Sequence, residues 1–429
     1  MLRHVWYGDD FTGASDTLAT LASAGLRALL FTQVPSAAHL ERAGPLDALG
    51  IAGTARALAP AAMREELAPV ADFFATLRAP LTHYKCCSTF DSAPNVGNLA
   101  VGLQALRRDA HQAVVPIVGG QPSLGRFCAF GELYATASAG GEVHRIDRHP
   151  TMSRHPVTPM HEADLRRHLA AQGLANVASI DLRALDEADD AALDTAFDDC
   201  RADALLFDTT RQAHLTRIGR LLWQRAERAP LLALGASSVA QALITHWQSQ
   251  GRAPGATQTV APAAGPVFLL VGSLSPVTAT QATAASGYET VEIPVQALVD
   301  DDSRVDALAA RCATMLREGR PVLARTRSAP GESAPPLAVA AACARLLARV
   351  LEHAPQVRRV GVAGGDTSSF ALRALAPWAL SWAGSLAPGV PLLRVHADDP
   401  ALDGLELMLK GGQMGPTDVF DRLLRGAPR

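Results

Sequence analysis

The chain has 429 residues, of which 48% are hydrophobic and 19% are charged, and its formal net charge is −3. This composition excludes a disordered or fibrous protein, and the charge balance argues against a general nucleic-acid binder, whose domain is usually strongly basic. No apolar stretch reaches the roughly 20 residues of a membrane-spanning helix, and the first residues lack the pattern of a secretory signal. We therefore expect a cytoplasmic globular protein with no nucleic-acid or membrane partner.

The length fits two domains better than a single core. Residues 249–265 are rich in Pro, Gly, Ala and Thr and have neither helical nor strand periodicity, which is typical of a linker. We predict an N-terminal domain over residues 1–250, a linker over 251–265 and a C-terminal domain over 266–429.

Short apolar runs alternate with helix-like stretches in both halves, which favours two α/β domains with mainly parallel sheets. The predicted strands cover residues 4–7, 28–31, 48–52, 113–118, 204–207, 231–234, 267–271, 322–324, 360–363 and 405–409. Parallel sheets bind ligands at the carboxyl ends of their strands. The loops that follow these strands are therefore the places to look for a functional site.

The chain opens with a strand that runs into Asp9 and Asp10, followed by Thr12 and Gly13 at the start of a predicted helix. Asp10 is suited to accept a hydrogen bond from a substrate hydroxyl and to take its proton as a general base. The alternative is that Asp9 or Asp10 only caps the helix. Two adjacent carboxylates at a strand end favour the functional reading.

A second polar cluster covers residues 85–92 (KCCSTFDS) and follows an apolar segment. Lys85 could neutralise a substrate carboxylate, and Ser88 and Thr89 could bind hydroxyl groups, with Asp91 close by in the chain. A solvated turn is the alternative, and the pattern alone does not decide between the two.

A third cluster, residues 145–161, combines arginine and histidine with proline, which excludes a regular helix. Arginines in a rigid loop suit carboxylate or phosphate binding, because the guanidinium offers two parallel donors. The histidines lack supporting cysteines or spaced carboxylates, so we predict no metal site made by the protein itself.

The cysteines are expected to be buried free thiols, which pack like small hydrophobic side chains. None of them forms a C-x-x-C pair or lies at zinc-ligand spacing from histidines. They are Cys86, Cys87, Cys128, Cys200, Cys312 and Cys343.

In the second half, three predicted strands end in glycine loops at residues 272–276 (GSLSP), 364–369 (GGDTSS) and 411–413 (GGQ). Glycine permits positive φ and a close approach of ligand to backbone, and a following helix offers free N–H groups to an anion. One such loop would be read as an ordinary turn, but three favour a site for the phosphates and ribose of a nucleotide. Neither a Walker P-loop nor an opening G-x-G-x-x-G is present.

Two details of these loops give further expectations. Ser275 before Pro276 predicts a helix N-cap. Asp366, ahead of a helix predicted from residue 370, either works beside phosphates, through Mg²⁺ or as a base, or caps that helix.

Taken together, these motifs resemble the four-carbon acid sugar kinase family over most of the chain. The resemblance depends on an ordered set of motifs at residues 9–14, 85 with 88–89, 155–156 with 159–160, 272–273, 364–368 and 410–412. It implies an N-terminal domain that binds a sugar acid, a C-terminal domain that binds ATP, and an active site in the cleft between them. It also implies Mg²⁺-dependent transfer of the γ-phosphoryl of ATP to a hydroxyl of 3-oxo-tetronate, threonate or erythronate.

The same resemblance implies roles for individual residues. The residues expected to contact the nucleotide are Ser273, Gly364, Gly365, Asp366, Thr367, Gly411 and Gly412. The residues expected to contact the acid are Asp9, Thr12, Arg56, Lys85, Ser88, Thr89, Asp91 and Arg154. The hydroxyl proton is expected to pass to Asp10 or Asp366, and this choice stays open, as does assembly into a homodimer.

The sequence also departs from the family pattern. Many members carry Asp-Thr-x-Ser-Arg where this chain has residues 53–56 (GTAR), and Asp-Ser-Thr-x-Arg-Gly where it has residues 87–91 (CSTFD). Residues 88–92 resemble the 3-oxo-tetronate branch, whereas residues 118–121 and 151–154 do not, so the identity of the acid stays open. A non-catalytic sugar-acid sensor and a Mg²⁺-dependent sugar-phosphate phosphatase are the alternative functions.

Overall fold

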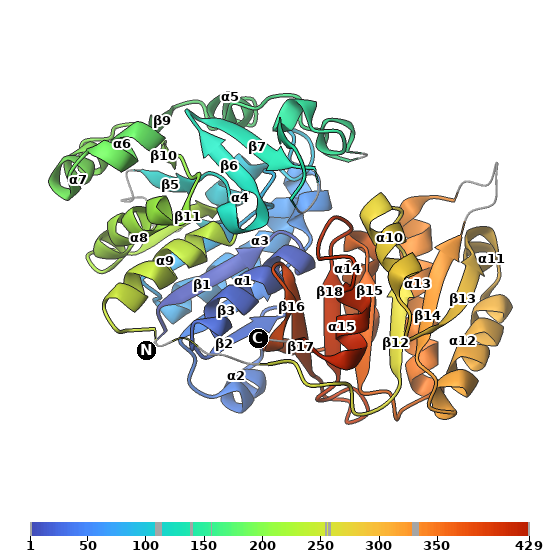
Figure 1. Ribbon diagram of the computed structural model, residues 1–429. Coiled ribbons are helices and arrows are strands. Elements are labelled where there is room, and N and C mark those ends of the chain that lie inside the picture. Colours follow the sequence, from blue (N-terminus) through green and yellow to red (C-terminus); the bar gives the residue numbers. More distant parts are fainter. Residues whose placement is uncertain are drawn as a thin grey trace. The chain divides into compact units, whose positions relative to one another are not determined.

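The computed structural model describes residues 2–107, 114–137, 140–155, 157–253, 255, 259–327 and 334–427. The chain divides into two compact units, Met1–Ala256 and Thr257–Arg429 (Figure 1). Within the predicted linker over 251–265, residues 254 and 256–258 lie outside the described residues. In the part of the chain that is described, no helix is long and apolar enough to cross a membrane.

The first unit is built on a parallel sheet. Its strands, in spatial order, are β2 (Ala28–Phe31), β3 (Ala48–Ala52), β1 (His4–Gly8), β4 (Leu81–Lys85), β11 (Leu231–Gly235), β5 (Val115–Val118), β10 (Ala204–Phe207) and β9 (Val177–Ile180). Most of these strands are buried along their whole length, as expected of parallel strands covered on both faces.

Helices and a small antiparallel sheet complete the first unit. The helices are α1 (Phe11–Ser23), α2 (Ala37–Ala43), α3 (Pro60–Leu77), α4 (Leu99–Leu106), α5 (Leu165–Ala170), α6 (Leu182–Glu187), α7 (Asp190–Asp198), α8 (Gln212–Ala226) and α9 (Ser238–Ser249). The antiparallel strands are β6 (Arg126–Ala129), β7 (Glu132–Thr136) and β8 (Val143–Arg145). The single-turn 3₁₀ helices are η1 (Ala55–Ala57), η2 (Pro122–Leu124), η3 (Ile146–Arg148) and η4 (Met152–Arg154).

The second unit has a mixed sheet. Its strands, in spatial order, are β13 (Glu289–Pro294), β14 (Val322–Arg327), β12 (Val267–Val271), β15 (Arg359–Ala363), β18 (Glu406–Lys410), β17 (Val390–His396) and β16 (Ala379–Ala387). The pairs from β13 to β18 are parallel, whereas β17 pairs antiparallel with both β18 and β16. Its helices are α10 (Pro276–Ala284), α11 (Val295–Asp300), α12 (Asp302–Arg317), α13 (Pro336–His353), α14 (Gly365–Leu375) and α15 (Val419–Arg425).

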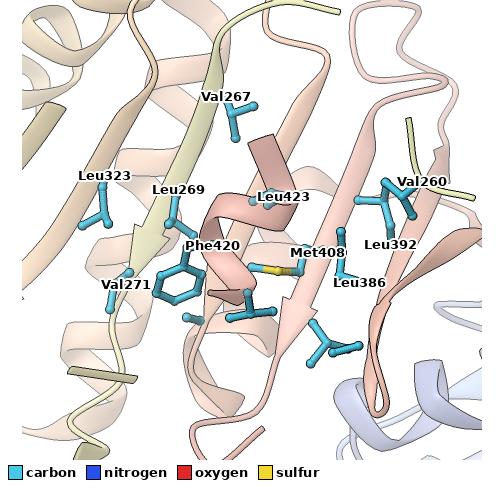
Figure 2. Packing of buried hydrophobic residues seen from close by; sticks show 14 of the residues in the cluster. Val260, Val267, Leu269, Val271, Leu323, Leu386, Leu392, Met408, Phe420 and Leu423 are labelled. Atoms are coloured by element: carbon cyan, nitrogen blue, oxygen red, sulfur yellow. The ribbon is translucent and has the colours of Figure 1, made fainter. Parts of the chain in front are cut away.

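One core of the second unit lies between its sheet and α15. Phe420 and Leu423 of this helix pack among buried side chains that include Leu269 of β12 and Met408 of β18 (Figure 2). Burying such a side chain stabilises the fold by about 1.5–3 kcal/mol. This packing fixes the strands whose carboxyl ends carry the glycine loops.

The predicted α/β class with mainly parallel sheets is confirmed, and the predicted strands recur with shifts of one to a few residues. Residue 113 of one predicted strand lies outside the described residues, and β5 begins at Val115. The hairpin of β16 and β17 was not predicted from the sequence. Its register shifts twice, between Trp382 and Gly384 and between Ser385 and Ala387, and such bulges break the alternation from which strands are recognised.

Candidate functional site

The polar segments of the first unit meet where neighbouring strands end. Gly8 is in register with both Ala52 and Lys85, so β1, β3 and β4 end at the same level. The backbone N–H of Asp9 donates to the carbonyl of Lys85 at 3.1 Å, and the N–H of Gly53 donates to the carbonyl of Gly8 at 2.8 Å. The fold therefore brings three separate stretches of sequence to one edge of the sheet.

Asp10 is the N-cap of α1. Its Oδ1 accepts from the Gly13 N–H at 2.9 Å, and its Oδ2 accepts from the Thr12 hydroxyl at 2.8 Å. Burial alone would raise the pKa of Asp10, but the charges of Arg56 and Lys85 and these hydrogen bonds hold it below its ordinary value. The capping role considered in the sequence analysis is thus real for Asp10, and it fixes the direction of the carboxylate.

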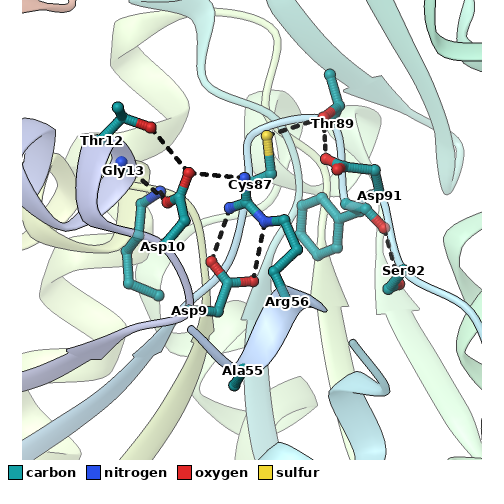
Figure 3. Close-up of polar contacts among 12 residues, drawn as sticks. Asp9, Asp10, Thr12, Gly13, Ala55, Arg56, Cys87, Thr89, Asp91 and Ser92 are labelled. Carbon is teal, nitrogen blue, oxygen red and sulfur yellow. Dashed lines mark hydrogen bonds and ion pairs between the residues drawn. The ribbon is translucent and has the colours of Figure 1, made fainter. Parts of the chain in front are cut away.

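Arg56 joins the two aspartates (Figure 3). Its Nη2 donates to Asp9 Oδ1 at 2.7 Å and its Nη1 donates to Asp10 Oδ2 at 2.8 Å. Asp9 is only 2% exposed, and burial, reinforced by the neighbouring Asp10 charge, raises its pKa to about 6 despite Arg56. Arg56 therefore holds two carboxylates close together that would otherwise repel each other.

Lys85 is a buried cation at the same edge, 3% exposed. Its Nζ lies 3.9 Å from Asp10 Oδ1, and among the described residues no acceptor lies within hydrogen-bonding distance of it. A Cβ on Gly13 would lie 1.8 Å from this nitrogen, so the ammonium reaches the site only because position 13 is glycine. An ammonium held in this way is suited to bind an anionic ligand.

The segment after β4 supplies hydroxyl, thiol and carboxylate groups. Thr89 Oγ1 lies 2.9 Å from Cys87 Sγ and donates to Asp91 Oδ1 at 2.5 Å (Figure 3), and Thr158 donates to the other oxygen of Asp91 at 3.2 Å. Burial raises the pKa of Asp91, but the Arg56 charge and these hydrogen bonds more than offset it, so the pKa is lowered overall. Cys87, Thr89 and Asp91 therefore form a hydrogen-bonded polar cluster rather than a solvated turn. Ser88 is half-buried beside it.

Residues 145–161 form no α-helix in their described part, as expected, and contain η3 and η4; residue 156 lies outside the described residues. Arg145 is paired with Asp147 and Glu132. Arg154 is exposed, and its side chain has no hydrogen bond or ion pair with the residues that the structure describes. Of the acid-binding residues predicted from sequence, Arg154 has the fewest interactions with the others among the described residues.

The three glycine loops of the second unit converge. Val271 is in register with Ala363, and Ala363 with Lys410, so β12, β15 and β18 end together. A Cβ on Gly412 would lie 2.9 Å from the Ser273 hydroxyl, and a Cβ on Gly364 would lie 3.2 Å from the Ser273 N–H. These loops lie so close together that a side chain at either glycine would clash, which leaves the peptide groups of the loops accessible to a ligand.

Gly364 is the N-cap of α14 and has φ +128°, a backbone conformation open to glycine. Asp366 is exposed in the first turn of this helix. The expectation that Asp366 caps the helix is therefore wrong, because α14 begins at Gly365 rather than at residue 370. Ser275 is the N-cap of α10 as predicted, but its hydroxyl makes no capping bond, and this buried oxygen has no hydrogen-bond partner among the described residues.

The sequence analysis assigned no role to Lys410. This lysine is fully buried, and its Nζ donates to the Thr278 hydroxyl at 3.0 Å and to the carbonyls of Gly411 at 2.9 Å and Met414 at 3.1 Å. Burial lowers its pKa to about 8. Lys410 therefore fastens the loop after β18, and the signal for it was a charged residue that ends an apolar strand.

The described residues contain no group of three or more His, Cys, Asp or Glu side chains that could hold a metal ion. The cysteines are free thiols, and four of them are buried: Cys86, Cys128, Cys312 and Cys343. Cys87 and Cys200 are only half-buried, which differs from the expectation for these two.

Two parts of the chain match separate family profiles. Residues 4–243 match the family profile of a sugar-binding N-terminal domain, and residues 268–420 match that of a nucleotide-binding C-terminal domain. The chain belongs to the four-carbon acid sugar kinase family. It is therefore an enzyme of the kinase class, and the sensor and phosphatase alternatives receive no support.

Curated relatives match the kinase over nearly its whole length. It is 35% identical to the 3-oxo-isoapionate kinase of Paraburkholderia graminis, over 98% of this chain and 94% of the relative. It is 34% identical to the 3-oxo-tetronate kinase of Methylobacterium radiotolerans, over 97% of each chain.

Solved structures show the same fold. A protein of Salmonella typhimurium described as a putative tRNA synthase superposes with a TM-score of 0.80, at 26% identity over 99% of both chains. A protein of Haemophilus influenzae superposes with a TM-score of 0.73, at 21% identity over 98% of both chains.

Proposed function

We propose that this kinase transfers the γ-phosphoryl group of ATP to a hydroxyl of a small 3-oxo sugar acid. The observation that carries the proposal is the buried ammonium of Lys85, which has no hydrogen-bond acceptor in the described residues and lies 3.9 Å from the Asp10 carboxylate. A cation and an acceptor side by side match a substrate that carries both a carboxylate and a hydroxyl.

The acid is proposed to bind at the strand ends of the first unit. Lys85 neutralises its carboxylate, and Asp10 accepts a hydrogen bond from the hydroxyl that becomes phosphorylated. Thr12, Ser88, Thr89 and Asp91 complete the polar surroundings of the acid. Arg56 and Asp9 act by holding Asp10, since Arg56 bonds both carboxylates.

The nucleotide is proposed to bind at the glycine loops of the second unit. The backbone groups of Gly364, Gly365, Gly411 and Gly412 let phosphate oxygens approach closely, and the N–H groups in the first turn of α14 complement their charge. Ser273 and Thr367 add hydroxyl groups. Mg²⁺ bound with the nucleotide would neutralise phosphate charge, and the exposed Asp366 is the carboxylate proposed to hold it.

The proposed reaction forms one bond and breaks another. The substrate hydroxyl oxygen bonds to the γ-phosphorus while the bond from that phosphorus to the bridging oxygen of ADP breaks. The hydroxyl proton passes to Asp10. The lowered pKa of Asp10 makes it a weak base, which suffices because phosphoryl transfer depends mainly on positioning and charge neutralisation.

The choice of acid follows from the named relatives. One acts on 3-oxo-isoapionate and several on 3-oxo-tetronate, so we propose a 3-oxo acid with a four-carbon backbone, either linear or branched. A cytoplasmic location and a homodimer remain predictions made from sequence.

The test measures ADP release from purified protein with Mg·ATP across a panel of four- to six-carbon hydroxy and 3-oxo acids. We expect turnover with one or two 3-oxo acids, and its loss in Lys85→Met while ATP still binds. Protein that binds ATP but turns over none of the acids would contradict the proposed substrate class. Phosphate release from a sugar phosphate without ATP would contradict the kinase itself.

A further inference from the structure

Arg126 is a cation that forms no ion pair with the residues that the structure describes. It is the first residue of β6, and its Nη1 donates to the backbone carbonyl of Leu124. Its Nε is buried and has no hydrogen-bond partner, and no carboxylate among the described residues forms an ion pair with it. By contrast, Arg145 and Arg166 of the same unit are paired with Asp147 and Asp164.

Hydrogen bonds connect the segment around Arg126 to the helix that carries the acid site. The backbone groups of Arg126 and Gln121 bond to each other at 2.8 Å and 3.2 Å. The side chain of Gln121, which is 1% exposed, donates to Asp16 at 3.0 Å, and Asp16 lies on α1, the helix that Asp10 caps. The strand before this loop, β5, pairs with β11, which in turn is in register with β4 up to Lys85.

Among the described residues, no carboxylate balances the charge of the Arg126 guanidinium. Burial lowers the pKa of Arg126, and the group that opposes this effect is the thiol of Cys87, two residues beyond Lys85. A partly buried charge and a buried, unpaired donor such as the Arg126 Nε both cost folding free energy. Proteins keep such groups where a ligand supplies the missing partner.

We infer that Arg126 is a second substrate-binding cation of the acid site, which binds the carboxylate of the sugar acid together with Lys85. This inference depends on the proposed kinase function. A guanidinium presents a planar pair of donors that matches both oxygens of a carboxylate, which an ammonium cannot do. Arg126 thus adds directional recognition of the carboxylate to the charge that Lys85 supplies.

The test compares the KM for the acid in wild-type protein, Arg126→Met and Arg126→Lys, using the best substrate of the panel. A charged hydrogen bond of this kind corresponds to about a tenfold to hundredfold change in binding. We expect the acid KM to rise by about that factor in Arg126→Met and by less in Arg126→Lys. The KM for ATP should stay within about twofold, because the loops proposed to bind the nucleotide belong to the other unit of the chain.

A second readout separates binding from mere support of the fold. The ratio of kcat/KM between the acid and its uncharged amide should fall in Arg126→Met, because the guanidinium contact with the carboxylate is lost, but it should stay above one because Lys85 remains. The control is Arg148→Met, an exposed arginine on the neighbouring η3, which should leave both values unchanged.

The outcomes are distinct. If the wild-type protein turns over an acid but Arg126→Met keeps both its acid KM and its preference for acid over amide, the inference is wrong and the kinase stands. If the wild-type protein phosphorylates no acid, the proposed function fails first. If Arg126→Met does not fold, Arg126→Lys supplies the same comparison of acid with amide.

Discussion

At the scale of single residues, Asp9 and Asp10 share the guanidinium of Arg56 but differ in their other contacts. Asp10 also accepts from Thr12 and Gly13, whereas Asp9 is more deeply buried. The pKa of Asp10 is therefore lowered, and that of Asp9 is raised to about 6. The two carboxylates should be separable by experiment.

Replacement of Asp10 by asparagine should mainly lower kcat. Asparagine caps a helix as well as aspartate does, so α1 should remain intact. It cannot take the hydroxyl proton, which is expected to lower kcat by about a hundredfold or more, while the KM for ATP stays near the wild-type value. Steady-state kinetics of Asp10→Asn check this. An unchanged kcat would show that Asp10 is not the base.

Protonation of Asp9 should determine how kcat/KM for the acid falls at low pH. Above about pH 6 its carboxylate is ionised and accepts from Arg56. Below that pH it takes a proton and the ion pair weakens, so kcat/KM for the acid should fall about tenfold per pH unit. In Asp9→Asn this fall should move to lower pH, because the remaining Asp10 has a lowered pKa. A fall that stays near pH 6 in the variant would assign it to another group.

At the scale of elements, parallel strands that end in register carry both proposed sites. In the second unit, β12, β15 and β18 end together, and their loops pack through glycine and serine backbone. The nucleotide site therefore depends on backbone conformation more than on side-chain chemistry. Gly364, with φ +128°, is the position where this dependence is greatest.

Replacement of Gly364 by alanine should weaken ATP binding specifically. The strained backbone costs about 1–3 kcal/mol, and the new Cβ would press on the Ser273 N–H. We expect the KM for ATP to rise while the KM for the acid changes little. The matched control is Gly319→Ala, a glycine with φ +80° and open space around its Cβ. It should lose stability without any change in the KM for ATP, and equal kinetic effects in the two variants would refute the loop assignment.

At the scale of the whole molecule, the first unit carries buried histidines that make its stability depend on pH. The rings of His4 and His83 stack with centroids 5.5 Å apart, and both are fully buried. Burial lowers the pKa of His83 to about 3 and also lowers that of His4, whose ring nitrogens have no partner. In the unfolded chain both titrate near 6.5.

The direction of this pH dependence follows from which state of the chain binds protons. The unfolded state takes up protons below about pH 6.5 and the folded state does not, so stability is lost as pH falls from 6.5 towards 3. Each histidine contributes up to about 1.4 kcal/mol per pH unit. Urea unfolding of His4→Phe should therefore show a gain relative to wild type that grows between pH 7 and pH 5. His161→Phe, at an exposed position, is the control and should show no such trend.

The α/β class, most strand positions and the glycine loops could be predicted from the sequence. Buried parallel strands such as Val267–Val271 appear as continuous apolar runs, and glycine marks the loops that follow them, so both signals are local. The bulged strand β16 escaped because its alternation is broken.

Which charges are paired could not be predicted from the sequence, because the partners meet only in the folded chain. Arg56 bonds Asp9 and Asp10 across separations of 47 and 46 residues, whereas Arg126 has no acidic partner among the described residues, and nothing local in the sequence distinguishes these two arginines. The pKa of a buried group and its freedom to bind a ligand depend on neighbours brought together by the sheet. A periodic pattern is a property of consecutive residues, but the balance of charge at a site is a property of the folded chain.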